Sequence, residues 1–349
     1  MKVDKEYCMS SFLMYRTIAD ENLTFANGIK PNIYQYQERF PIYNSEQLEK
    51  YLKQRVGEVT KNGKAALALS GGIDSAILAK FMPEGSTAYT FRCVVPGVAV
   101  KDESKKAAKI AKECGLKHKI VEITWQDMER YASELMLSKG APIHSIEIQI
   151  YKAALQAKTD GFEKLIFGES ADCIYGGLNQ LLSKDWLFGE FIDRYSFVIP
   201  WKVLKKPKLI LEPYMEYEKN GYVDVHKFMY NFFFRESVGS YDNACNLAGI
   251  DFVAPYAETV FSKELDYDRV RNGENKYVVR EIFKRLYATE QIPEKLPMPR
   301  PVNEWLKDWK GPTREEFLEN CVIGLNGDQK WLVYILEKFL NLINEKGDN

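Results

Sequence analysis

The sequence feature that most constrains the fold is an apolar run that passes through Ser70-Gly71-Gly72 into a helix-like apolar pattern. Residues 64–69 have the character of a strand buried on both faces, and residues 76–81 have the 3.6-residue spacing of a helix packed on that strand. The segment between them is therefore expected to be a strand-to-helix turn. Glycines let an anion approach the backbone N–H groups there, and a helix N-terminus favours negative charge. The stretch predicts a phosphate-binding loop.

Three side chains of this loop add chemistry to the backbone. Ser70 and Ser75 supply hydroxyl donors, and Asp74 places a carboxylate beside the expected phosphate. Because a carboxylate and a phosphate repel each other, we expect a cation between them, and Mg²⁺ prefers such oxygen ligands. A bare Gly-Gly pair is more often an ordinary tight turn. The complete Ser-Gly-Gly-Ile-Asp-Ser is far more specific, although it lacks the Gly-Lys-Ser/Thr of a Walker loop.

Strand and helix patterns alternate beyond this loop. The pattern predicts strands over residues 86–92, 119–123 and 163–168, with helices over residues 101–114 and 146–157 between them. Such alternation predicts an α/β fold with a doubly wound parallel sheet flanked by helices. We expect three parts: a lead-in over residues 1–60 that packs on the core, the α/β core over 61–185, and a mainly helical part over 186–349.

A second informative loop, Gly168-Glu169-Ser170-Ala171-Asp172, follows the expected fourth strand. Ligands of a doubly wound sheet bind at the carboxyl ends of its strands, so the loops after the first and fourth strands are expected to face one cleft. Acidic residues after a strand often only cap the next helix. Here, however, Glu169 and Asp172 would approach the phosphates bound by the first loop.

Composition excludes several classes of protein. The 48 basic and 49 acidic residues nearly cancel, which gives no electrostatic reason to expect a nucleic-acid partner. No apolar run approaches the roughly 20 residues of a membrane span, and the first residues do not resemble a signal peptide. The six cysteines are scattered and the three histidines are dispersed, which favours free thiols in a cytoplasmic protein over a disulfide framework or a histidine metal site. Self-association stays open.

Taken together, the motifs resemble the synthetase domain of asparagine synthetases, which are N-type ATP pyrophosphatases with an SGGxDS pyrophosphate loop. The family pattern GEGADELFGGY is similar to residues 168–177, with Ser170 at the second Gly and Cys173 at the second Glu. A family Lys-x-x-Leu-Arg is similar to residues 276–280. The likeness covers about residues 10–310. It implies an adenine nucleotide alpha hydrolase-like fold and cleavage of ATP into AMP and pyrophosphate.

The resemblance also implies roles for individual residues. A carboxylate substrate would be adenylated, and ammonia or an amine would then displace AMP to form an amide. The implied sites are a pyrophosphate cradle (Ser70, Gly71, Gly72, Ser75), further ATP contacts (Leu69, Phe91, Arg92, Gly168), Mg²⁺ ligands (Asp74, Asp172) and catalytic groups (Glu169, Lys276, Arg300). Glu169 would act as general base or bind the nitrogen.

Departures from the family pattern leave the substrates open. The glutaminase domain that precedes the family's synthetase half is not expected here, so nitrogen would come from free ammonia, an amine or a separate glutaminase subunit. Val302 stands where the family has a lysine, and Arg300 is expected to supply the missing charge. Asn243 and Val253 are among the replacements near the acceptor region, so the acid stays open. A thiolating enzyme using Cys173 and a non-catalytic nucleotide-binding protein are the alternatives.

Overall fold

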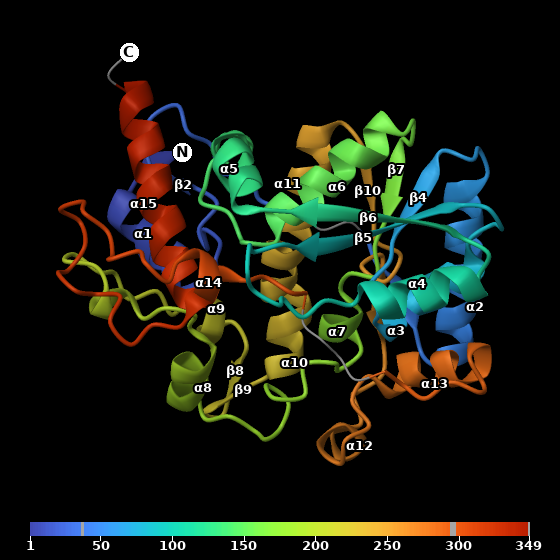
Figure 1. The fold of residues 1–349 in the computed structure, drawn as a ribbon. Helices are drawn as coiled ribbons and strands as arrows, with labels where there is room; N and C mark the ends of the chain where they lie inside the picture. The colour runs from blue at the N-terminus through green and yellow to red at the C-terminus, as the bar shows by residue number, and fades with distance from the viewer. Residues whose placement is uncertain (36–37, 294–297, 348–349) are drawn as a thin grey trace.

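A sheet of five parallel strands organises the computed structural model, which describes residues 1–35, 38–293 and 298–347 (Figure 1). Its strand order is β10 (Asp251–Val253), β7 (Lys164–Ile166), β4 (Ala65–Ala68), β5 (Thr87–Cys93) and β6 (Lys117–Ile123). The chain starts this sheet at β4, adds β5 and β6 on one side, and then adds β7 and β10 on the other. This is the doubly wound arrangement that the sequence predicts.

The alternation of side chains along β4 explains why its sequence is apolar throughout. Ala65 and Leu67 belong to one hydrophobic core, whereas Ala66 and Ala68 belong to a second core. Successive residues of a strand point to opposite faces of the sheet, so each face of β4 contacts a different core. The strand is therefore buried on both faces, as its pattern indicates.

Helices cover both faces of the sheet (Figure 1). On one face α2 (Ser45–Thr60), α3 (Ile73–Phe81) and α4 (Ser104–Glu113) lie together, and α13 (Tyr277–Leu286) packs on α2 and α3. On the other face α6 (Glu147–Thr159) packs on β5 and β6, α11 (Phe234–Ala248) packs on β10, and α5 (Trp125–Lys139) contacts both of these helices. Among the expected elements, α4 begins three residues later than predicted, because the Asp102 carboxylate accepts the N–H of Ser104 at 2.7 Å and holds a turn there.

The remaining helices and strand pairs lie outside the five-stranded sheet. The helices are α1 (Lys5–Tyr15), α7 (Ala171–Ile174), α8 (Phe188–Tyr195), α9 (Glu212–Met215), α10 (Val225–Phe228), α12 (Tyr267–Arg271), α14 (Val302–Trp305) and α15 (Gly327–Gly347), with the 3₁₀ turn η1 (Pro200–Lys202) and the π-helical segment η2 (Met229–Phe233). Small strand pairs are β1 (Lys2–Val3) with β2 (Leu23–Thr24), β3 (Phe40–Ile42) with β11 (Thr259–Phe261), and β8 (Glu218–Lys219) with β9 (Tyr222–Val223). In Figure 1, β5 and β6 point toward the side where α14 and α15 lie.

Three features of the fold differ from the sequence expectation. Helix α5 and the buried helix α1 were not predicted as elements, and β10 comes from the part expected to be mainly helical. Strand β10 has only three residues, too few for a period-2 pattern to stand out, and its pairing with β7 defines it. Within the described ranges, no helix has both the length and the apolar character needed to cross a membrane.

Candidate functional site

A cavity of about 1320 Å³ lies between the carboxyl edge of the sheet and the helical part of the chain. Its lining includes the loops that follow β4 and β7, which meet where the strand order reverses. Ligands of doubly wound folds bind at this switch point. Because pockets for one small ligand usually measure about 300–1000 Å³, the cavity has room for a nucleotide and a second substrate.

The loop between β4 and α3 is held closed by its two serines. The hydroxyls of Ser70 and Ser75 lie 2.9 Å apart, and the Ser75 hydroxyl accepts the Ser70 N–H at 3.0 Å. The N–H of Gly72 donates to the Ser70 hydroxyl at 3.1 Å. Helix α3 begins at Ile73, so its first N–H groups have no acceptor within the helix. The loop is preformed and presents donors that suit a phosphate.

Gly168 and Gly71 lie where neighbouring segments approach too closely to leave room for a side chain. A Cβ atom on Gly168 would lie 2.9 Å from the Ser75 backbone nitrogen and 3.1 Å from the Asp74 carbonyl carbon. A Cβ atom on Gly71 would lie 2.7 Å from the Cβ atom of Lys106 on α4. Gly168 therefore lets the loop after β7 contact the loop after β4, and Gly71 lets the first loop pack on α4.

Replacing Gly168 by alanine is expected to destabilise the fold by roughly 1–3 kcal/mol, the usual cost of forcing extra atoms into a packed site. The new methyl group would press on backbone atoms, which move less readily than a side chain. Urea unfolding of Gly168→Ala measures the effect. Gly189→Ala is the control, because a Cβ atom there meets no atom within 4 Å on helix α8. Equal stability of the two variants would contradict the prediction.

Lys276 links the two loops. Its Nζ atom lies 2.6 and 2.8 Å from the carboxylate oxygens of Asp74 and 2.9 Å from Oδ1 of Asp172. The residue is only 4% exposed and adopts a left-handed backbone conformation with φ of 57°. Burial by itself would lower the pKa of this ammonium, but the carboxylates of Asp172 and Asp74 outweigh burial and raise the pKa. Lys276 therefore keeps its charge, in a strained conformation typical of functional sites.

The carboxylates of Asp74 and Asp172 fit a magnesium ion only together with phosphate oxygens. They lie close enough to share one ammonium group, and both line the cavity beside the 70–75 loop. Mg²⁺ is usually bound by one or two carboxylates and the phosphates of a nucleotide. In the part of the chain that the structure describes, no group of three or more His, Cys, Asp or Glu side chains is arranged to hold a metal ion.

Glu169 lies on the loop after β7 and faces helix α11. The Ser237 hydroxyl donates to its Oε1 atom at 2.6 Å, and the Ser170 N–H and the Tyr241 hydroxyl also bond to its carboxylate. Burial raises the pKa of Glu169, although the bonds from Ser237 and Ser170 oppose this shift. A carboxylate with a raised pKa, lining the cavity, is suited to take a proton from a reacting nitrogen.

Ser170 occupies a backbone position that favours glycine. Its φ is 73°, and its hydroxyl oxygen is buried without a hydrogen-bond partner among the described residues. The asparagine synthetase pattern noted above has glycine at this place. An L-residue in the left-handed region costs about 1–2 kcal/mol. The position therefore stores strain beside Glu169.

We expect Ser170→Gly to stabilise the protein by about 1 kcal/mol, because glycine relieves the left-handed strain. The change also removes a buried hydroxyl that no described group pairs. Thermal and urea unfolding measure this gain. Ser262→Gly is the control, since Ser262 is exposed and its φ is not positive, so glycine there should not stabilise. A loss of stability in Ser170→Gly would show that the serine has a partner or role of its own.

Most of the site residues predicted from the sequence line this one cavity. They are Leu69, Ser70, Gly72, Asp74, Ser75, Phe91, Gly168, Glu169, Asp172, Lys276 and Arg300. Gly71 and Arg92 are not among the described lining residues, and the Arg92 guanidinium pairs with Glu122 on β6. Arg300 binds Asp328 at 2.6 Å, whereas Val302 is buried in α14. The cavity therefore brings together all but two of the predicted positions.

Other residues of the cavity were not predicted. Arg16 at the end of α1, His144 before α6, and Ser237 and Tyr241 on α11 all line the cavity or bond to a lining residue. The one sequence signal for Arg16 is its place directly after a short apolar run. The others lie in segments whose patterns indicate only a helix or a loop.

Three solved structures align with most of the chain at low identity. A protein described as a predicted subunit of tRNA methyltransferase from Methanocaldococcus jannaschii is 16% identical over 72% of this chain and 94% of its own, with a TM-score of 0.30. An NH3-dependent NAD synthetase from Campylobacter jejuni is 14% identical over 73% and 100%, with a TM-score of 0.27. An NMN synthetase from Francisella tularensis is 12% identical over 74% and 100%, also with a TM-score of 0.27. Scores this low carry no argument about activity.

Comparing the sequence with known proteins and with family models gives clearer evidence of the chain's family than the solved structures do. No curated protein matches the chain significantly. The family model for asparagine synthase, however, matches residues 47–320, a range that contains both loops and Lys276. The match supports an ATP-using, ligase-like enzyme of amidation or adenylation chemistry. Because this match spans most of the sequence, the chain belongs to the asparagine synthase family.

Proposed function

We propose that this protein is an ATP-dependent amide-forming ligase of the AMP-forming type. It would adenylate a carboxylate, release pyrophosphate, and transfer ammonia or an amine to the acyl-adenylate. The observation that carries the proposal is the position of Lys276, whose Nζ atom bridges Asp74 and Asp172 beside the 70–75 loop. A buried ammonium next to a preformed phosphate loop suits a reaction in which negative charge develops on a phosphate leaving group.

In the first step, an oxygen of the substrate carboxylate bonds to the α-phosphorus while the bond to pyrophosphate breaks. Ser70, Ser75 and the loop glycines would cradle the pyrophosphate, and Lys276 would neutralise its charge. Asp74 and Asp172 would hold Mg²⁺, which supplies further neutralisation of phosphate charge when bound. The residues at the ends of β4 and β5, with Gly168, would contact the nucleotide. This step depends mainly on position and charge.

In the second step, the nitrogen attacks the acyl carbon, a carbon–nitrogen bond forms, and the bond to AMP breaks. The nitrogen must lose a proton, and Glu169 would accept it. Its raised pKa and its bonds to Ser237 and Tyr241 support this assignment. Ammonia, an amine or a separate glutaminase subunit would supply the nitrogen. Arg300 lines the same cavity and would add positive charge there.

The position of Cys173 favours amidation over thiolation. A thiolating enzyme would need a reactive thiolate in contact with its substrate. Cys173 is buried in α7 and is not among the described residues that line the cavity. A Cys173→Ser variant should therefore keep its activity.

The proposal is tested by identifying the nucleotide products. The protein is incubated with ATP, Mg²⁺, ammonium and pools of carboxylic acids, and the products are analysed by mass spectrometry. We expect AMP and pyrophosphate with one pool, and the matching mass change identifies the acid. Asp74→Ala should abolish both products. ADP and phosphate as the products would exclude this mechanism, and nucleotide binding without AMP from any pool would favour a non-catalytic protein.

A further inference from the structure

An aromatic part of the cavity lies beside Glu169, and the proposed reaction gives it no role. Met229 and Phe233 line it, and they are the first and last residues of the π-helical segment η2. Helix α11 continues from there, and four residues beyond Phe233 the Ser237 hydroxyl donates to Glu169. Four residues advance a helix by about 6 Å, so Phe233 lies about one turn from the residue that holds the candidate base. Short π-helical segments next to α-helices frequently occur at functional sites.

Two further rings belong to this part of the cavity. Tyr195 at the end of α8 and Phe197 just beyond it also line the cavity, and their ring centroids lie 5.5 Å apart. The Phe233 ring lies 6.4 Å from the Tyr195 ring. We name Tyr195, Phe197, Met229 and Phe233 the aromatic arm. Phe197 and Phe233 are only partly buried, so apolar surface faces the cavity, and contact with an apolar part of a ligand would remove that surface from water.

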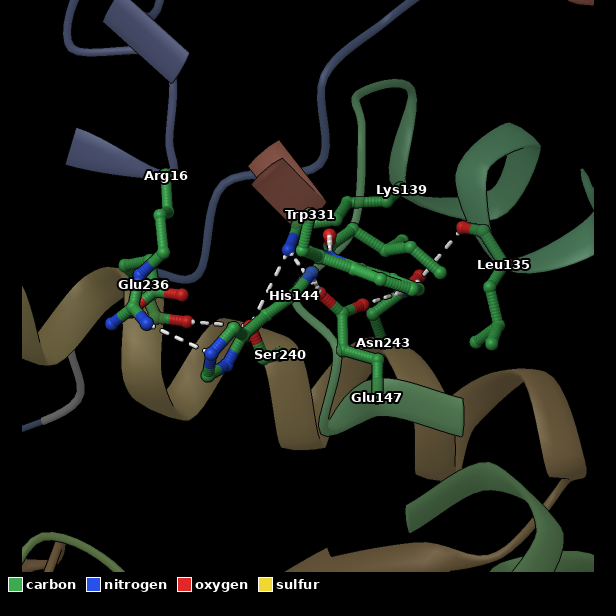
Figure 2. A network of polar contacts seen from close by, with 10 residues as sticks. Arg16, Leu135, Lys139, His144, Glu147, Glu236, Ser240, Asn243 and Trp331 are labelled. Atoms are coloured by element: carbon green, nitrogen blue, oxygen red, sulfur yellow. Dashed lines mark hydrogen bonds and ion pairs between the residues drawn. The ribbon is translucent and has the colours of Figure 1, made fainter. Parts of the chain in front are cut away.

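Arg16 brings a positive charge to the aromatic arm, but this charge is paired. Its guanidinium carbon lies 4.0 Å from the centre of the Phe197 ring. As Figure 2 shows, Nη2 of Arg16 donates to Oε2 of Glu236 at 2.9 Å, and Nη1 donates to Nε2 of His144 at 2.8 Å. Burial, and then the charge of Arg16, hold the pKa of His144 well below its ordinary value, so His144 is neutral. The carboxylate of Glu236 therefore compensates the Arg16 charge.

A second buried ion pair behind the arm adds no net charge either (Figure 2). Lys139 Nζ donates to Oε1 of Glu147 at 2.5 Å, and Glu147 also accepts Nδ2 of Asn243 at 3.2 Å. Lys139 is 6% exposed and Glu147 is fully buried. A charged group of a ligand would enter a region where both cations already have an acidic partner. Burial of a charge without a partner is strongly unfavourable, so the arm favours an uncharged group.

The polar atoms beside the arm agree with a neutral ligand group. The Tyr195 hydroxyl and Nε of Arg16 can donate, Oε1 of Glu236 can accept, and none of these three atoms has a hydrogen-bond partner among the described residues. Tyr195 is 6% exposed and Glu236 is 3% exposed. Because donors and an acceptor occur together, a neutral group can bond to them, whereas an anion would meet the Glu236 carboxylate.

We propose that the aromatic arm binds the body of the acceptor acid, and that this body is uncharged and about the size of an aromatic ring. The carboxylate of the acid would lie near the loops after β4 and β7, and its body would pack on Phe197 and Phe233. The arm would thereby select monocarboxylic acids with an apolar or aromatic body over dicarboxylic acids. The inference rests on the proposed function for the identity of the reacting carboxylate, but binding to the arm is measurable without turnover.

The test is calorimetric binding of four defined acids in the presence of α,β-methylene-ATP, which cannot release pyrophosphate. Butyrate and 4-phenylbutyrate differ by a ring, and we expect the ring to tighten binding about tenfold or more, as burial of an aromatic group warrants. The acids 4-(4-carbamoylphenyl)butyrate and 4-(4-carboxyphenyl)butyrate have the same shape and differ by one charge. We expect the neutral amide to bind about tenfold or more tightly than the dicarboxylate.

A conservative variant connects the ring preference to the arm. Phe233→Leu should weaken binding of 4-phenylbutyrate about 3- to 10-fold, because it removes a ring–ring contact, and should leave the affinity for butyrate unchanged. Phe162→Leu is the matched control, since Phe162 is also partly buried but precedes β7 and is not among the described lining residues. Unfolding curves of both variants show whether the folds are intact.

A second variant tests the charge argument by reversing it. Glu236→Gln removes the carboxylate that compensates Arg16, so the Arg16 charge becomes available to a ligand. The dicarboxylate should then gain about tenfold in affinity relative to the amide, as a charged hydrogen bond warrants. Glu163→Gln, at an exposed position, should leave this ratio unchanged.

Three results would overturn the inference. The first is equal binding of butyrate and 4-phenylbutyrate, or no binding of any probe. The second is a wild-type protein that binds the dicarboxylate as tightly as the amide. The third is a ring preference that Phe233→Leu leaves unchanged, since the ring would then bind elsewhere. None of them bears on whether AMP and pyrophosphate are formed. Failure of the ligase proposal therefore appears in the nucleotide products, and failure of this inference appears in the binding data.

Discussion

Replacing Lys276 by methionine is expected to lower kcat/KM for pyrophosphate release by about 100- to 1000-fold, the usual loss when one fixed charge-stabilising group is removed. The ammonium lies within 2.9 Å of both Asp74 and Asp172 and keeps its proton. Methionine has a similar length without the charge, so the phosphate leaving group would lose a cation. Release of pyrophosphate measured against ATP concentration tests this expectation.

The control for this variant separates catalysis from stability. Lys276→Met leaves the Asp74 and Asp172 carboxylates without the ammonium between them, so unfolding must be measured beside the kinetics. Lys263→Met, at an exposed position, removes a lysine elsewhere and should change neither quantity. A folded Lys276→Met protein with activity within a few fold of the wild type would contradict the role that we assign to this lysine.

Replacing Glu169 by glutamine is expected to separate the two steps of the reaction. Amide formation should fall by about 100- to 10,000-fold, which is the typical contribution of a general base. Exchange of pyrophosphate into ATP should stay within a few fold, because the first step needs no proton transfer from the nitrogen. Glutamine keeps the shape of the side chain and can still bond to the Ser237 hydroxyl. Parallel assays of exchange and amide formation measure the difference.

The pH profile gives a second test of Glu169. The base must be deprotonated, so the rate of amide formation should fall as the pH drops through its pKa. Burial raises that pKa, so this limb should lie above the usual glutamate value of about 4.3. The limb should be absent in Glu169→Gln and present in the control Glu163→Gln, whose side chain is exposed. An equal loss of exchange and amide formation in Glu169→Gln would assign the residue to the first step.

The predictable part of the fold follows from local patterns. The apolar character of β4 predicts burial on both faces, and Ala65 to Ala68 divide between two cores. The alternation of strands and helices predicts the parallel sheet, and strand order then brings the loops after β4 and β7 together. The burial of a strand or helix and the geometry of a turn depend on the types of a few neighbouring residues, so both can be recognised in the sequence pattern.

The unpredicted part consists of short or unusual elements. Three residues of β10 form a strand only because β7 lies beside them. Helix α1 is buried by α15 and other distant segments, although its own sequence shows little beyond an apolar run. Tertiary contacts determine whether such segments form a strand or a helix, because the intrinsic conformational preference of a few residues is weak.

The sequence by itself determined the chemistry of the first loop: two serines, two glycines and an aspartate between a buried strand and a helix. The tertiary structure decided which distant groups this loop meets. Lys276 contacts Asp74 across 202 positions of the chain, and Arg16 contacts Glu236 across 220. No local pattern encodes such pairs, because they arise only when the sheet and its helices close around the cavity.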